Sequence, residues 1–219
     1  MAFNPQMDIP DDALQDFKNF EQLLETKYPV KKGALNRIYM HCSFAPNGMK
    51  YSDYNVMTLL NGKLTVSITG NPQDNVPGLT DNAIHPHTFH RNEGAVGISI
   101  DGMEDAKTDD FGSNAHSQLE LLYLCGCVAA TAKAYDIDIS GVVKKGKTHL
   151  DKDGGTVNTK GENNALTHAE CAVIDLYPNE RWDLGILEAI AKGKSLTPKM
   201  RTTSGNILRE CAHRIKLLL

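Results

Sequence analysis

Residues 114–135, NAHSQLELLYLCGCVAATAKAY, are the stretch of the sequence that decides the fold. Apolar side chains recur along it at three- and four-residue steps, which is the spacing of one stripe of an α-helix. The stripe consists of Leu119, Leu122, Cys125, Val128, Ala129 and Ala132. Several of these residues are small, so a β-sheet can approach the helix closely. We therefore expect this segment to be the main core helix, packed against a sheet.

Short apolar runs upstream of this helix predict the strands of that sheet. They are RIYMHC (37–42), VMTLL (56–60), KLTVSI (63–68) and AVGISI (95–100). Asn61-Gly62 separates the second and third runs, and this dipeptide is typical of a two-residue type I′ hairpin turn. The sequence therefore predicts an α/β fold with a central mixed sheet of about five strands, the 114–135 helix on one face and a further helix over 183–192 nearby.

The remaining segments divide the chain into a central domain with appendages. Residues 1–34 contain DDALQDFKNFEQLLETKYP, whose periodicity predicts an amphipathic helix that ends at Pro29, and we expect a helical extension there. Residues 35–193 form the central domain, and 194–219 form a C-terminal helical tail. Within the domain, 143–166 is rich in glycine and polar residues and has almost no apolar ones, so we expect an exposed insertion.

Composition excludes several classes of protein. The chain has 219 residues, of which 41% are hydrophobic and 23% charged, as in a globular domain and unlike a disordered tail or a coiled coil. A net charge of −4 argues against a nucleic-acid partner. No apolar run is long enough to cross a bilayer, and the acidic opening MAFNPQMDIPDD is unlike a signal peptide, so we expect synthesis in the cytoplasm. Five cysteines, an odd number, favour reduced structural thiols.

Two of the eight histidines are candidate metal ligands. His41 lies at the end of a predicted strand, and His168 lies in the string THAE, where apolar character resumes after the polar insertion. Neutral imidazole is the commonest protein ligand for metals, and a catalytic zinc ion typically takes three protein ligands. The two histidines are 127 residues apart (168 − 41), so no short-range zinc spacing links them. Two ordinary core or surface histidines remain the alternative.

The order of the motifs along the chain resembles that of the zinc-dependent N-acetylmuramoyl-L-alanine amidases. The strings, in order, are RIYMHCS, DYNV before the hairpin, HTFHRNEGAVGISIDG, the core helix, THAE and RWDL. These enzymes share a fold with peptidoglycan recognition proteins, and the phage endolysins among them are the most similar. The resemblance extends from about residue 35 to about residue 192. It implies an amidase-like fold and a Zn²⁺ cofactor for the central domain.

The resemblance also implies a set of metal ligands. His41 corresponds to the first ligand of the family and His168 to the second. Asp183 corresponds to the third, because Arg181 supplies the basic residue two positions upstream and a predicted helix follows. Asp175 remains a rival third ligand, since the separation of 15 residues (183 − 168) is longer than in many relatives. An ordinary acidic residue at a helix N-terminus is the other interpretation of Asp183.

Two catalytic residues are implied in the same way. Tyr54 corresponds to a tyrosine on the strand beside the metal, whose phenol points at the bound water or the tetrahedral intermediate. Arg181 stays charged in a protein, so its implied role is to stabilise the oxyanion. Ser99 stands where several relatives have a catalytic glutamate, which removes a glutamate base from the predicted site.

The substrate groove of the family maps onto the segment before residue 95. His87 corresponds to a histidine of that groove and Asn92 to an asparagine that shapes its wall, whereas His85 and His90 are read as polar loop residues. Cys42 follows His41 directly. Because neighbouring strand residues point to opposite faces, we expect Cys42 to pack away from the metal.

The implied activity is zinc-dependent hydrolysis of the amide between N-acetylmuramic acid and L-alanine in bacterial peptidoglycan. Two alternatives remain open: a binding module that holds muropeptide without cutting it, and a zinc peptidase that cuts within the stem peptide. Without a signal peptide, the expected place of action is the cell wall after release of the protein, as for a phage lysin or a virion-associated enzyme. A monomer is the simplest expectation for its assembly.

Overall fold

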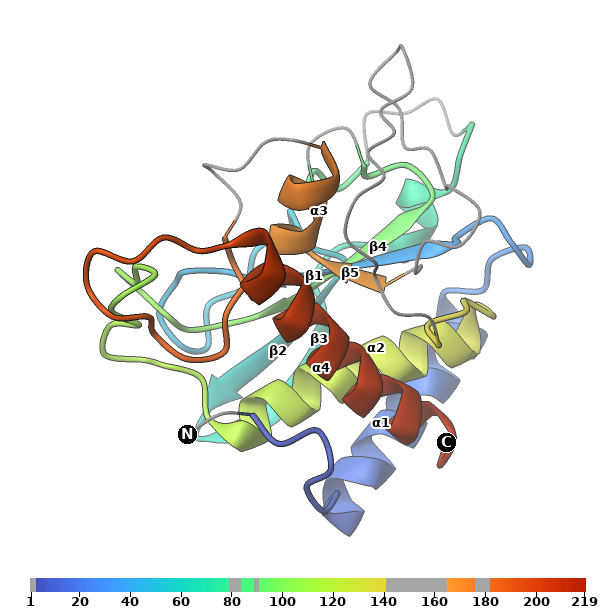
Figure 1. Ribbon diagram of the computed structural model, residues 1–219. Coiled ribbons are helices and arrows are strands. Elements are labelled where there is room, and N and C mark those ends of the chain that lie inside the picture. The colour runs from blue at the N-terminus through green and yellow to red at the C-terminus, as the bar shows by residue number, and fades with distance from the viewer. Residues whose placement is uncertain (1–2, 79–83, 89–90, 141–164, 176–181) are drawn as a thin grey trace.

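The computed structural model describes residues 3–78, 84–88, 91–140, 165–175 and 182–219, and a mixed sheet of five strands forms their centre (Figure 1). The strands are β1 (Arg37–Cys42), β2 (Val56–Asn61), β3 (Lys63–Ile68), β4 (Ala95–Ile100) and β5 (Ala165–Thr167). Their order across the sheet is β3-β2-β4-β1-β5. The β2–β3 pair is antiparallel and the other pairs are parallel. The predicted α/β class with a central mixed sheet is confirmed.

The two faces of the sheet bury different sets of side chains. Alternation along β1 sends Ile38, Met40 and Cys42 into the main hydrophobic core, and Tyr39 into a smaller cluster that also contains Cys171. His41, at an alternate position to Met40 and Cys42, therefore shares the face of Tyr39. The strand thus directs His41 away from the main core, at the carboxyl end of β1.

Helices cover both faces of the sheet. They are α1 (Asp11–Lys27), α2 (Gln118–Ala134), α3 (His168–Asp175) and α4 (Pro198–Lys216), with a 3₁₀ turn, η1, at Pro72–Asn75. In Figure 1, α2 lies against one side of the sheet with α1 and α4 beside it, and α3 lies on the other side. Ser117 caps α2 in a reciprocal capping box with Glu120. Most side chains of α2 are buried, as expected for the main core helix.

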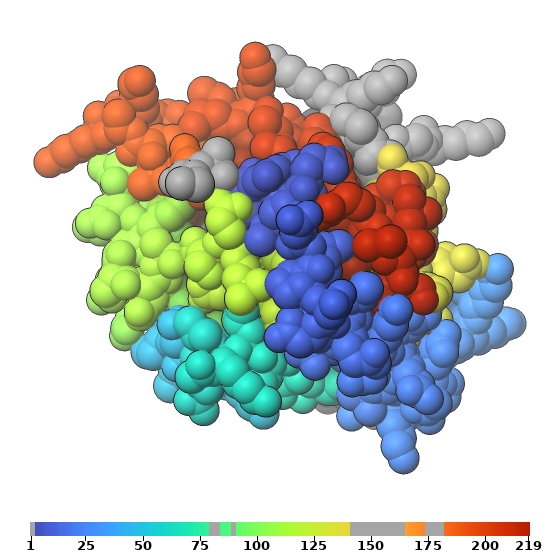
Figure 2. Space-filling view, turned by 90° about the horizontal axis from the view of Figure 1, so that it is seen from below, coloured from blue at the N-terminus to red at the C-terminus, as the bar shows by residue number. Residues whose placement is uncertain are grey.

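The terminal segments pack into the same core as α2. Phe17, Phe20 and Leu24 of α1 and Leu208, Cys211 and Ile215 of α4 all belong to the main hydrophobic cluster. Gly126 of α2 makes the approach of α1 possible, because a Cβ atom there would overlap the ring of Phe17. Figure 2 shows the N-terminal segment lying beside the C-terminal helix, where Arg214 donates a hydrogen bond to the Met7 carbonyl at 2.5 Å.

Three local predictions need correction. Residues 183–192 form no helix: they run as turns and bends, Leu184 has a left-handed backbone (φ 57°), and the Ile190 amide donates to the Thr108 carbonyl. Tertiary contacts have thus overridden the helical periodicity of this segment. The hairpin exists, but Asn61 pairs with Lys63, so only Gly62 lies in the turn. Ala165–Leu166, which we assigned to the polar insertion, are buried residues of β5, and 143–164 lie outside the described residues.

Two further features concern the whole chain. All five cysteines are buried thiols, as the sequence predicted. Within the described part of the chain, none of the helices has both the length and the apolar character that spanning a bilayer requires.

Candidate metal centre

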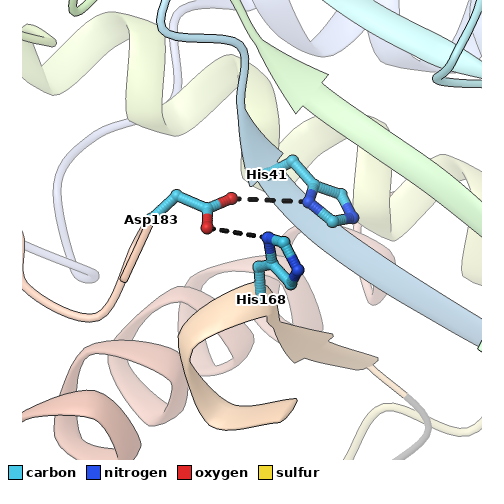
Figure 3. Close-up of side chains that lie close together, drawn as sticks. All are labelled: His41, His168 and Asp183. Atoms are coloured by element: carbon cyan, nitrogen blue, oxygen red, sulfur yellow. Dashed lines mark ion pairs between the residues drawn. The ribbon is translucent and has the colours of Figure 1, made fainter. Parts of the chain in front are cut away.

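His41, His168 and Asp183 converge at the carboxyl ends of two neighbouring parallel strands (Figure 3). His41 is the penultimate residue of β1, and His168 opens α3 directly after β5, which pairs with β1. Asp183 reaches them from the turns after residue 182. One side-chain ligand atom from each residue lies within 4.8 Å of the other two. Residues distant in sequence therefore form one compact cluster of metal-ligating atoms.

A single carboxylate faces both imidazoles. Oδ1 of Asp183 lies 2.8 Å from Nδ1 of His168, and Oδ2 lies 3.4 Å from Nδ1 of His41. The backbone amide of Cys42 also donates to Oδ2, at 3.3 Å. Burial alone would raise the pKa of Asp183, but the charges of and hydrogen bonds from His168 and His41 together lower it well below its usual range. The carboxylate is therefore ionised, as a metal ligand must be.

The donor set fits a divalent metal ion that keeps an open coordination position. Two imidazole nitrogens and one carboxylate oxygen are three of the ligands that catalytic zinc sites use. His41 and Asp183 are almost fully buried, at 1% and 3% exposure, whereas the side chain of His168 is 20% exposed. The cluster is consequently open to solvent on the side of His168.

Tyr54 lies beside the cluster, although not on a strand as predicted. It occupies the bend directly before β2, and its ring centroid is 5.3 Å from that of His41. Burial, followed by the negative charge of Asp183, raises the pKa of the Tyr54 phenol, while a hydrogen bond with Ser99 opposes the shift. The phenol therefore remains protonated at neutral pH. Ser99, opposite His41 in the β1–β4 register, is thus a partner of Tyr54.

A buried ion pair supports the element that carries His168. Glu170, two residues further along α3, receives two hydrogen bonds from the guanidinium of Arg209 in α4, at 2.5 and 2.7 Å. Thr167 and Glu170 also bond reciprocally at the start of α3, in the pattern of a capping box. Arg209 binds the Ala165 carbonyl as well, at 2.9 Å. Glu170 therefore anchors the β5–α3 corner and is fully engaged in that role.

His87 and Asn92 lie behind the cluster. His87 is buried against Gly97 of β4, with Asn75 and Thr88 at its two ring nitrogens. Burial, and then the neighbouring histidines, lowers its pKa well below the ordinary value. The side-chain oxygen of Asn92 accepts from the Thr88 amide at 2.6 Å. Both residues therefore hold Thr88, which itself contacts His41. Their role in a substrate groove stays a prediction.

The other predicted residues have separate positions. Cys42 is buried on the core side, and its Sγ lies 3.6 Å from the Gly102 carbonyl, so it packs away from the cluster as expected. The ring of His85 lies 2.5 Å from the Ser52 carbonyl at the surface. Arg181 and His90 lie outside the described residues.

The rival third ligand, Asp175, ends α3 at the opposite end from His168. Seven residues separate the two along the helix, a rise of about 10 Å at 1.5 Å per residue. The side chain of Asp175 lies outside the part of the chain that the structure describes. Among the described residues, Asp183 is the aspartate that completes a potential metal-binding group with His41 and His168.

Sequence reasoning missed two residues near the cluster. Arg201 of α4 is buried at 6% exposure, and the charge of Asp183 acts on it: burial lowers the pKa of Arg201 and Asp183 opposes that shift. Thr88 contacts His41 directly, with Oγ1 3.0 Å from Nε2. Thr88 lies in a loop and Arg201 lies in the first turn of α4. Neither residue belongs to a sequence motif that indicates a functional role.

We compared the chain with protein-family models, curated proteins and solved structures. The chain matches no protein-family model, no curated protein and no solved structure.

Proposed function

We propose that the protein is a zinc-dependent amidase whose metal ligands are His41, His168 and Asp183. The observation that carries this proposal is the convergence of two imidazoles and one ionised carboxylate from three separate segments. A zinc ion held there supplies Lewis acidity, which activates water near neutral pH and polarises a scissile carbonyl.

The chain's own residues supply the remaining chemistry. The phenol of Tyr54, protonated and next to His41, is placed to donate a hydrogen bond to the oxygen that gains negative charge as the carbonyl is attacked. Arg181 is proposed to stabilise the same charge. Arg201 is buried and interacts electrostatically with Asp183, so its positive charge offsets negative charge at the centre. The exposed side of His168 gives a substrate access to the cluster.

The proposed substrate is the amide between N-acetylmuramic acid and L-alanine in bacterial peptidoglycan. This part of the proposal is supported by the order of sequence motifs that resembles the amidases. It is also supported by the position of Tyr54 beside a His, His, Asp cluster, the arrangement which that resemblance implies. As in phage lysins, the proposed site of action is the cell wall, reached after release of the protein.

Metal analysis and product identification together test the proposal. The purified protein is expected to hold one zinc ion per chain, and digestion of peptidoglycan is expected to release free stem peptides with an L-alanine amino terminus. His41→Ala and His168→Ala should lose the metal and the activity and remain folded. His213→Ala, a change on α4 with no contact to the cluster in the described structure, is the matched control.

Three results would contradict the proposal. Cleavage that survives exhaustive chelation would exclude the metal centre. New peptide carboxyl groups within the stem would identify a peptidase instead. Binding of muropeptide without any cleavage by the zinc-loaded protein would identify a recognition module.

A further inference from the structure

We infer that Thr88 is a positioning residue for His41, directing Nδ1 of this imidazole toward the metal by holding its Nε2. This inference rests on the metal centre proposed above and concerns a residue that does not itself contact the metal. Four buried polar side chains carry it, connected in the order Asn75, His87, Thr88 and His41. The directions of the first two hydrogen bonds, from Asn75 to His87 and from His87 to Thr88, follow from groups that cannot reverse.

The orientation of Asn75 is fixed by the backbone. Its Oδ1 accepts from the His85 amide at 3.1 Å, and its Nδ2 donates to the Asn92 carbonyl at 3.0 Å. A flipped side-chain amide would face an N–H with its own NH₂ group and a carbonyl with its own oxygen. Because Asn75 is fully buried, water cannot compensate for that mismatch. Nδ2 of Asn75 is therefore the atom that faces His87.

The tautomer of His87 follows from this orientation. Nδ2 of Asn75 lies 3.4 Å from Nε2 of His87, so that ring nitrogen accepts a hydrogen bond. A neutral imidazole carries one proton, which must then be on Nδ1. Nδ1 lies 3.1 Å from Oγ1 of Thr88 and donates to it. His87 thus supplies Thr88 with a hydrogen bond of fixed direction.

Thr88 passes this constraint to His41. Its Oγ1 lies 3.0 Å from Nε2 of His41, while Nδ1 of the same ring faces Asp183. A histidine that binds a metal through one nitrogen carries its proton on the other and donates it to a neighbouring oxygen. Oγ1 has two lone pairs, so it can accept from His87 and from His41 together.

A hydroxyl group suits this position with and without the metal. When Nδ1 of His41 carries the proton and faces Asp183, Thr88 can donate its own proton to Nε2. When a metal takes Nδ1, the hydroxyl can rotate and accept from Nε2–H instead. The imidazole ring keeps its place in both states, so the site is preorganised for the metal. A methyl group in place of the hydroxyl can do neither.

The test is the zinc affinity of Thr88 variants, measured by competition with a chromophoric chelator. Thr88→Val keeps the shape of the side chain and removes the hydroxyl, and it should weaken zinc binding by about 10- to 100-fold. Thr88→Ser restores the hydroxyl and should restore most of the affinity. Thr131→Val is the matched control: Thr131 is buried in α2, its hydroxyl has no partner among the described residues, and its loss should leave the affinity unchanged.

A measurement on the unaltered protein keeps the inference testable if Thr88→Val does not fold. Two-bond ¹H–¹⁵N spectra of the histidine rings, recorded with and without zinc, should show His41 metallated on Nδ1 and protonated on Nε2. Metallation of His41 on Nε2 would overturn the inference. Wild-type zinc affinity in a folded Thr88→Val protein would overturn it as well. Neither result would contradict the proposed metal centre. A wild-type protein that binds no zinc would overturn both.

Discussion

At the scale of single residues, the hydroxyl group of Tyr54 is the most direct test of the proposed chemistry. Tyr54→Phe keeps the ring beside His41 and deletes the donor, so kcat and kcat/KM should fall together by about 10² to 10³. Zinc content and melting temperature should not change. Tyr51→Phe is the control, because Tyr51 lies in the same loop and its hydroxyl contacts Met49. Full activity in the Tyr54→Phe variant would leave the ring with a packing role alone.

A second pair of substitutions tests which of the two candidate aspartates is the third metal ligand. Asp183→Ala removes the carboxylate that faces both imidazoles, so the zinc affinity should fall by an amount similar to the effect of losing a histidine ligand. Asp175→Ala, at the far end of α3, should leave zinc binding intact. Inductively coupled plasma analysis of both dialysed proteins gives the answer. The opposite pattern would transfer the ligand to Asp175.

At the scale of secondary-structure elements, the ion pair between Glu170 and Arg209 joins α3 to α4. Arg209→Met would leave a buried carboxylate without its partner, which costs about 3 to 5 kcal/mol in the free energy of unfolding. Arg214→Met, five residues further along α4, removes a hydrogen bond to the Met7 carbonyl and should cost much less. Urea denaturation of both variants measures the difference. Equal losses would show that the pair contributes no more than an ordinary contact.

The packing of α1 on α2 belongs to the same scale. Phe17 fills the space that Gly126 leaves open, so Phe17→Ala should cost about 3 to 5 kcal/mol of stability. Leu23→Ala is the control on the same helix, because Leu23 is 39% exposed. Chemical denaturation should show one cooperative transition in both proteins. A separate early transition in wild-type protein would mean that α1 folds as an independent unit.

At the scale of the whole molecule, stability should depend on the protonation of His116. Burial lowers the pKa of His116, although the charge of Glu120 and a hydrogen bond to the Asp101 carbonyl oppose the shift. Below the ordinary histidine pKa of about 6.5, the unfolded chain therefore binds a proton that the folded chain does not. The free energy of unfolding is consequently highest above that pH and falls as the solution becomes more acidic.

The variant His116→Gln keeps a donor for the Asp101 carbonyl and removes the titration. Its unfolding free energy should therefore decrease less than that of the wild type between about pH 7.5 and about pH 5.5. The other histidines are common to both proteins, so the difference between the two slopes isolates His116. Identical slopes would exclude this contribution.

The sequence predicted the central strands and the main helix well, because each depends on a local apolar pattern. The bounds of β1 and β4 agree with the expected runs, and α2 with the apolar stripe. The segment after Asp183 has a similar helical pattern and nevertheless forms turns. There, Trp182 packs against Phe44, and Asp183 points toward the histidines. The spacing of apolar residues along a short segment does not predict such tertiary contacts.

The candidate site shows the same limit. His41 and His168 were identifiable because both lie at element boundaries, where metal ligands commonly occur. Asp183 was identified only through a resemblance, since nothing in its spacing links it to the histidines. Thr88 had no sequence signal at all, because its contact with His41 joins two residues that are 47 positions apart, and no local pattern marks such a contact.

The five buried cysteines allow local unfolding of this protein to be measured by thiol labelling. A thiol reagent reaches a buried cysteine only while the surrounding layer is open, so the labelling rate at each site measures the free energy of that local opening. Cys171 in α3 samples the side of the candidate metal centre, whereas Cys42 samples the main core on the opposite face of β1. Cys125, Cys127 and Cys211 sample the helical layer of α2 and α4. The order in which the five cysteines become labelled would therefore rank the parts of the molecule by local stability. No cysteine would have to be introduced by mutation.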